Sequence, residues 1–172
     1  IDEIRKNGFD NIYPFINHDS IENMDRTLAK TIDGFSHFIA EIKPDLIIVH
    51  GDRVEAMAGA IVGSLNNILV AHIEGGEVSG TIDELVRHAV SKMSHIHLVA
   101  NKEARMRLIQ LGELPSSIFV LGSPDLDLMS SEKLPSIDDI KEYYDIEFKD
   151  FSIAMFHPVT TEYKNIQKNA EH

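Results

Sequence analysis

Two pairs of a histidine and an acid follow two short apolar runs of this sequence, and a third acid comes soon after. The pairs are His50-Gly-Asp52 and His72-Ile-Glu74, and the third acid is Asp83. Clustered carboxylates raise one another's proton affinity, so one site can supply both a base and an acid near neutral pH. They can also stabilise a cationic transition state, such as the oxocarbenium-like centre of glycoside chemistry. If they converge, the three acids are therefore candidates for acid–base chemistry.

The same residue types admit a second interpretation, a zinc or manganese site of a metal-dependent phosphoesterase. Its ligands would be His50, Asp52, His72 and Glu74. Residues i and i+2 of a strand share a face, but they form no fixed chelate by themselves. His95 and His97 open the next apolar run, so we expect them at the amino end of its strand, in structural roles away from the site.

Short apolar runs alternate with amphipathic helical patterns along most of the chain. The runs cover residues 45–50, 68–73, 95–100 and 117–122. The helical patterns cover residues 20–43, 53–67, 83–93 and 102–112, with Ser20 as the expected N-cap of the first and Pro44 as its end. This alternation is typical of βαβ units and predicts an α/β fold with a Rossmann-like, doubly wound parallel sheet.

In such sheets ligands bind beyond the carboxyl ends of the strands, and the unusual polar residues of this sequence fall there. Arg53 precedes a predicted helix, where it and the helix N-terminus could favour a phosphate. Gly51 and the pair Gly75-Gly76 indicate a positive φ or close approach of the backbone to a ligand. A lone acid before a helix is more often a cap, but clusters at several strand ends favour one shared site.

The chain divides by composition into three parts. Residues 1–125 are predicted to form most of one Rossmann-like domain, 126–150 a linker with a short acidic helix, and 151–172 the start of a second such domain, opening with a strand at 151–156. Residues 1–7 look like a helix already in progress that stops at Gly8. Because both ends look abrupt, we expect the sequence to be a fragment.

Composition excludes several classes of protein. The 172 residues carry a net charge of −12, which argues against nonspecific binding to nucleic acid or anionic membranes. The sequence has no cysteine and hence no disulfide framework, and no apolar run approaches the length of a membrane span. These features predict a soluble, cytoplasmic protein. A P-loop and a G-x-G-x-x-G motif are also absent.

Four segments of the sequence together resemble the UDP-N-acetylglucosamine 2-epimerases. They are HGDRVEAMAGA, HIEGGEVSGTIDELVRHAVSKMSHIHLVAN, LGSPDLDLM and FHPVTTE, and the resemblance runs from about Ile42 to Glu162. HIEGGEVSGTIDE is the most specific of them. The resemblance is to the hydrolysing branch, which makes N-acetylmannosamine for sialic acid and capsule biosynthesis.

The resemblance implies a two-domain fold of the glycosyltransferase B type and elimination of UDP from C1, followed by hydration of the 2-acetamidoglucal. Asp52, Glu74 and Asp83 match the family's catalytic acids. Arg53 and His157 match positions near the diphosphate. His72 and Gly76 are also expected at the substrate. His50 and His72 are expected to support the acids. No cofactor or metal is implied. The partners would be a UDP sugar and further copies of the chain, as a dimer or tetramer.

Two further functions stay open beside this one and the phosphoesterase. Relatives in the bacterial branch act on modified UDP sugars such as UDP-diacetylbacillosamine, and Glu74 favours UDP-N-acetylglucosamine without settling the substrate. A non-catalytic nucleotide-binding or assembly module is the other possibility.

Overall fold

The computed structural model describes residues 1–17, 23–130, 134–155 and 166–171. The chain forms two compact units, Ile1–Ser123 and Pro124–His172. Among the described residues, no helix has both the length and the apolar character needed to cross a membrane.

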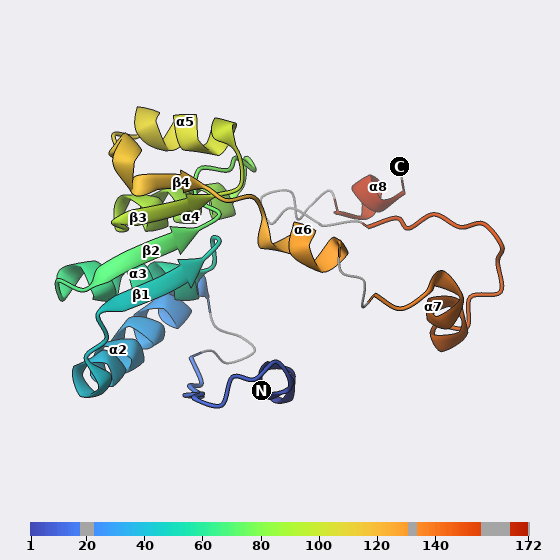
Figure 1. Cartoon of the computed structure of the whole chain (residues 1–172), viewed down its shortest axis with the longest axis horizontal. Coiled ribbons are helices and arrows are strands. Elements are labelled where there is room, and N and C mark those ends of the chain that lie inside the picture. The colour runs from blue at the N-terminus through green and yellow to red at the C-terminus, as the bar shows by residue number, and fades with distance from the viewer. Residues whose placement is uncertain (18–22, 131–133, 156–165, 172) are drawn as a thin grey trace. The chain divides into compact units, whose positions relative to one another are not determined.

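The first unit is built on a four-stranded parallel sheet (Figure 1). Its strands lie in chain order: β1 (Leu46–His50), β2 (Leu69–Ile73), β3 (Ile96–Val99) and β4 (Ile118–Val120). All four lie within the predicted apolar runs, so the predicted α/β class with a parallel sheet is confirmed.

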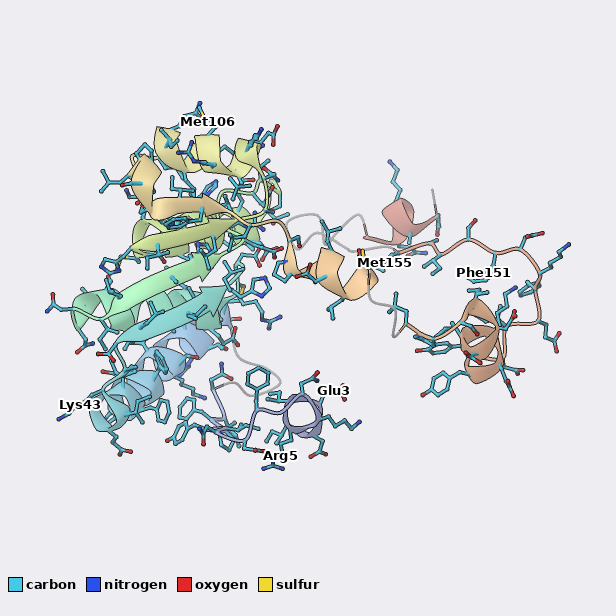
Figure 2. The ribbon with its side chains drawn as sticks, in the orientation of Figure 1. Glu3, Arg5, Lys43, Met106, Phe151 and Met155 are labelled. Atoms are coloured by element: carbon cyan, nitrogen blue, oxygen red, sulfur yellow. The ribbon has the colours of Figure 1, made fainter. Side chains whose placement is uncertain are left out.

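Two helices precede β1: α1 (Asp2–Lys6) and α2 (Met24–Ile42). The strands are connected, as the periodicity predicts, by α3 (Val54–Leu65), α4 (Ile82–Lys92) and α5 (Lys102–Gln110), and a short 3-10 helix (Pro115–Ser117) precedes β4. The predicted cap Ser20 lies outside the described residues, and Asn23 is the N-cap of α2. Lys43 ends α2 in the left-handed conformation, directly before Pro44, and is labelled at that end of the helix in Figure 2.

One face of the sheet carries the core. Ile47 pairs in register with Val70, and Val49 with His72, so their side chains point to the same side. Buried residues of α3 and α4 pack against that side, and Val99 and Ile118 continue the face under α5. Right-handed connections that always step in the same direction place successive helices on the same face, which explains this arrangement.

The opposite face is open in the described part of the chain. Ile48, Leu69 and Phe119 are 48–60% exposed there. In a doubly wound sheet helices cover both faces. Among the described residues, helices cover only one face of this sheet.

The described residues of the second unit form three short helices: α6 (Pro124–Met129), α7 (Ile137–Tyr143) and α8 (Ile166–Ala170). Ser136 and Asp139 form a reciprocal capping box at the start of α7. Phe151 lies beside α7 (Figure 2), with the Lys141 ammonium 5.4 Å from its ring centre.

The strand predicted at 151–156 is wrong for its described part. Residues 151–155 have no regular secondary structure, and Phe156 lies outside the described residues. A strand needs a hydrogen-bonded neighbour, and the described residues after Ser123 include no other strand. The division into 1–125, 126–150 and 151–172 stays a prediction.

The turn after β2 is bound tightly to α5. Gly76 has φ +81°, and a Cβ on it would lie 2.4 Å from the carbonyl oxygen of Ala104. Its own carbonyl accepts a 3.0 Å hydrogen bond from Arg107. Gly80, in the same loop, has φ +68° but nothing within 4 Å of such a Cβ. Gly76 therefore carries a steric constraint that Gly80 lacks.

We expect Gly76→Ala to lower the free energy of unfolding by about 3 kcal/mol or more, since it combines a left-handed φ with a backbone clash. Gly80→Ala, the matched control, should cost about 1 kcal/mol for its φ alone. Urea unfolding of both variants measures the difference. Equal losses would mean that contact with α5 does not require a glycine at position 76.

Candidate active site

Backbone hydrogen bonds connect the carboxyl end of β1 to that of β2, and the carboxyl end of β2 to that of β3. The Gly51 amide donates to the carbonyl of Ile73 at 3.0 Å, and the Glu74 amide donates to the carbonyl of Leu98 at 2.8 Å. These bonds continue the parallel ladders past the strand ends. They bring the loop of Asp52 and the loop of Glu74 to one edge of the sheet, as the sequence predicts.

Asp52 is paired with a buried arginine, Arg87, that was not among the site residues expected from the sequence. The Arg87 guanidinium binds Asp52 Oδ2, and its side chain is only 10% exposed. It also donates to the Glu77 carbonyl at 3.0 Å and to Ser79 Oγ at 3.5 Å. Arg87 therefore joins the loop after β1 to the loop after β2. Its signal in the sequence was an arginine beside Val86, on the apolar stripe of an amphipathic helix.

Glu74 is held by two donors from different strand ends. Ser123 Oγ donates to Glu74 Oε1 at 2.6 Å, and His50 Nε2 lies 2.8 Å from Glu74 Oε2. The Ser123 hydrogen bond, followed by that of His50, lowers the pKa of Glu74 below its ordinary value. Glu74 itself has φ +63°, an uncommon conformation for a residue with a side chain. It is thus an ionised and oriented carboxylate at neutral pH.

Asp83 stands in the first turn of α4 and is exposed. Thr81, the residue before this helix, donates from Oγ1 to Asp83 Oδ2 at 3.1 Å. Asp83 and Asp52 line one cavity of about 270 Å³ at the N-termini of α2, α3 and α4. Its lining residues are Met24, Thr27, Asp52, Arg53, Val54, Glu55 and Asp83.

Arg53 is the exposed cation of this cavity. Its side chain is 82% exposed, and its Nε lies 3.4 Å from Glu55 Oε2. Asn17 holds the other oxygen of Glu55 with a 3.0 Å hydrogen bond. The guanidinium therefore remains accessible to an anionic ligand near Asp52, as expected for a contact to a diphosphate.

His72, which we expected near the substrate, is fully buried. Its Nε2 lies 2.8 Å from the Gly51 carbonyl and must donate to it, so Nδ1 accepts the 3.0 Å hydrogen bond of Ser91 Oγ. Burial lowers the pKa of this imidazole to about 4, and it is neutral at pH 7. In the structure His72 thus holds the backbone next to Asp52, the supporting role that the sequence predicts, and its contact with a ligand stays a prediction.

Gly76 faces α5, and its expected contact with the substrate stays a prediction. The clash that a Cβ would make there, and the hydrogen bond to Arg107, explain this glycine by packing of the loop. Gly75 is likewise a packing residue, because a Cβ on it would lie 2.8 Å from both His72 Nδ1 and Ser91 Oγ. His157 lies outside the described residues, and its contact with a diphosphate stays a prediction.

The four ligands of the phosphoesterase alternative do not converge. His72 has both nitrogens engaged, and Asp52 is paired with Arg87. Among the described residues, no three His, Asp or Glu side chains are grouped so that they could hold a metal ion. At the amino end of β3, His95 Nδ1 accepts from the Val70 amide at 3.1 Å and His97 is fully buried, which confirms their structural role.

Comparison with known proteins gives a consistent result. A family model described as UDP-N-acetylglucosamine 2-epimerase matches residues 3–171. A UDP-N-acetylglucosamine 2-epimerase of Neisseria meningitidis serogroup B is 51% identical over 160 residues, 93% of this chain. A UDP-N,N'-diacetylbacillosamine 2-epimerase (hydrolyzing) of Legionella pneumophila is 38% identical over 146 residues, 84% of the chain. The chain spans 42% and 39% of the lengths of these two relatives.

Solved structures agree with the fold. The crystal structure of a UDP-GlcNAc 2-epimerase from Neisseria meningitidis bound to UDP-GlcNAc superposes with a TM-score of 0.66 at 23% identity. The match covers 76% of this chain and 37% of that one.

The neutral imidazole of His72 makes stability depend on pH. Its pKa is 6.5 in the unfolded chain and about 4 in the fold, so the whole contribution is present above pH 6.5. As the pH falls from 6.5 to 4, only the unfolded chain takes up the proton, and up to about 3 kcal/mol of stability is lost. Urea unfolding at about pH 7.5 and about pH 5 measures the part of this loss already reached at the lower pH, about 2 kcal/mol.

In His72→Gln this part of the pH dependence should disappear, whereas His37→Gln, at an exposed position of α2, should retain it. The difference between the variants separates His72 from the carboxylates that titrate in the same range. A His72→Gln protein with the full acid sensitivity of the unmodified protein would contradict the assignment.

Replacing Arg87 should test the link between the two loops. Arg87→Met leaves Asp52 without its cation, and we expect a loss of about 3–5 kcal/mol in the free energy of unfolding. Arg105→Met on α5 is the matched control, with a loss below about 1 kcal/mol, because its guanidinium makes an exposed 3.2 Å bond to the Pro115 carbonyl. Adding Asp52→Asn to Arg87→Met should restore part of the stability, since it removes the unpaired charge. A double variant no more stable than Arg87→Met would argue against the pair.

Proposed function

Because the chain belongs to the UDP-N-acetylglucosamine 2-epimerase family, we propose that the complete protein is a hydrolysing 2-epimerase. It would convert UDP-N-acetylglucosamine and water to N-acetylmannosamine and UDP, for sialic acid or capsule biosynthesis. The chain covers about two fifths of the relatives named above, so the proposal concerns the complete protein.

The observation that supports this chemistry is the placement of three carboxylates in three different environments at one edge of the sheet. Asp52 is paired with Arg87, Glu74 is hydrogen-bonded to Ser123 and His50, and Asp83 is exposed on the cavity that Asp52 lines. Carboxyl groups in different environments can take different roles in one reaction.

The reaction needs such groups because the C2 proton of the sugar is not acidic in the ground state. The C1–O bond must first weaken, so that positive charge develops at C1 as UDP leaves with the bonding electrons. A carboxylate then takes the C2 proton, and the C–H electrons form the C1–C2 double bond of 2-acetamidoglucal. In the second step water adds across this bond: a proton returns to C2 with inverted configuration and hydroxide joins C1.

Asp52, Glu74 and Asp83 would share three tasks: stabilising the cation, removing the C2 proton, and delivering the proton or water of the second step. Arg53 would bind the diphosphate and assist its departure, since its guanidinium is exposed beside the acids. His157 is proposed for the same anion. No step requires a metal or an organic cofactor.

The substrate has a second candidate. The Legionella relative is named for UDP-N,N'-diacetylbacillosamine and for hydrolysis, which supports the hydrolysing branch and keeps this sugar open. The greater identity to the Neisseria protein favours UDP-N-acetylglucosamine. Assembly into a homo-oligomer is part of the proposal.

The test is incubation of the complete protein with UDP-N-acetylglucosamine in deuterated water. We expect UDP and N-acetylmannosamine that carries deuterium at C2, because the proton added in the second step comes from solvent. Mass spectrometry and NMR of the sugar measure both. Release of N-acetylglucosamine would indicate simple hydrolysis, and turnover of the diacetylated sugar alone would select the second substrate.

Asp52→Asn removes a carboxylate and should lower kcat by about a hundredfold or more. Asp45→Asn, before the amino end of β1, is the matched control and should leave kcat unchanged. Unchanged product formation by Asp52→Asn would remove this residue from the mechanism.

A further inference from the structure

The hydrogen bond between Ser123 and Glu74 joins strand ends that are not neighbours in the sheet. Glu74 follows β2, whereas Ser123 follows β4, and β3 lies between these strands. The Leu121 amide donates to the Val99 carbonyl at 3.0 Å, which keeps the chain on the ladder of β3 just past β4. Gly122 then turns the chain with φ +93°. This turn lets the half-buried hydroxyl of Ser123 reach Glu74.

The bond has a defined direction. An ionised carboxylate only accepts, so the Ser123 hydroxyl must donate, and at 2.6 Å the contact is short even for a charge-assisted hydrogen bond. The second oxygen of Glu74 is occupied by His50 Nε2 at 2.8 Å. Two donors on the two oxygens fix the plane of the carboxylate as well as its position.

We propose that Ser123 is a positioning residue for the reaction, which holds the Glu74 carboxylate ionised and oriented toward the sugar. The effect of Ser123 on catalysis rests on the proposed function, whereas its hydrogen bond to Glu74 is present without substrate. Ser123 contacts Glu74 and acts on the reaction only through it.

The charged surroundings of Glu74 support this role. His50 contacts it from β1 and Ser123 from the end of β4, and the positive charge of Arg87 on α4 also lowers its pKa. The Ser123 hydrogen bond is the largest of the effects that lower the pKa of Glu74. Without this hydroxyl the carboxylate should take up a proton at higher pH, and its Oε1 oxygen should lose its fixed direction.

The experiment has one arm that does not depend on activity. In the complete protein with ¹³C-labelled glutamate, NMR follows the side-chain carboxyl of Glu74, assigned by its absence in Glu74→Gln. We expect it to titrate at a higher pH in Ser123→Ala than in the unmodified protein. Ser123→Thr, which retains the hydroxyl, should return the titration toward that of the unmodified protein. Ser117→Ala, which loses a 2.8 Å bond to the Leu114 carbonyl before β4, should not change it.

The second arm is the pH–rate profile with UDP-N-acetylglucosamine. Ser123→Ala should lower kcat by about tenfold at neutral pH, with a smaller change in KM, and move the acidic limb of the profile to higher pH. If the unmodified protein releases no UDP, the proposed function fails while the titration still decides the role of Ser123. A Ser123→Ala variant whose Glu74 titrates as in the unmodified protein would overturn the assignment.

Discussion

The buried guanidinium of Arg87 is the constraint on which the site depends. A charge that is removed from water must be paired and hydrogen-bonded, and Arg87 meets this requirement with Asp52, the Glu77 carbonyl and Ser79. Its partners come from the loops after β1 and after β2. The structure can therefore bury Arg87 only when both loops are in place, so the folding of α4 against the sheet also assembles one edge of the site.

Neutral polar groups extend this assembly into the core. His72 connects the Gly51 carbonyl to Ser91 on α4, and Gly75 leaves the space that this pair occupies. An imidazole with one nitrogen donating and the other accepting satisfies two buried groups without carrying a charge. His72 thus holds the backbone next to Asp52 through the Gly51 carbonyl, and Arg87 on α4 holds the Asp52 side chain.

The three carboxylates differ because their neighbours differ. Asp52 faces a buried cation, Glu74 faces a hydroxyl and an imidazole, and Asp83 faces solvent and the Thr81 hydroxyl. Chemically similar groups in such different surroundings can take different roles in one reaction. Gly75 and Gly76 allow the loop to pack against the His72–Ser91 pair and against α5.

The sequence by itself determined the four strands of the sheet, the helices between them and the acids at the strand ends, because hydrophobic periodicity is a local property of the chain. It also identified the family, through the segments around Asp52 and Glu74. Tertiary structure decided which polar residues meet. Nothing in the sequence distinguishes Arg87 from other helical arginines, because its partners meet it only when α4 packs against the sheet. Ser123 lies 49 residues from Glu74 in the sequence, and only β4 and the turn after it bring the two side chains into contact. The burial of His72 and the close packing of Gly76 against α5 were decided in the same way, because burial depends on what packs over a residue and no local pattern records that.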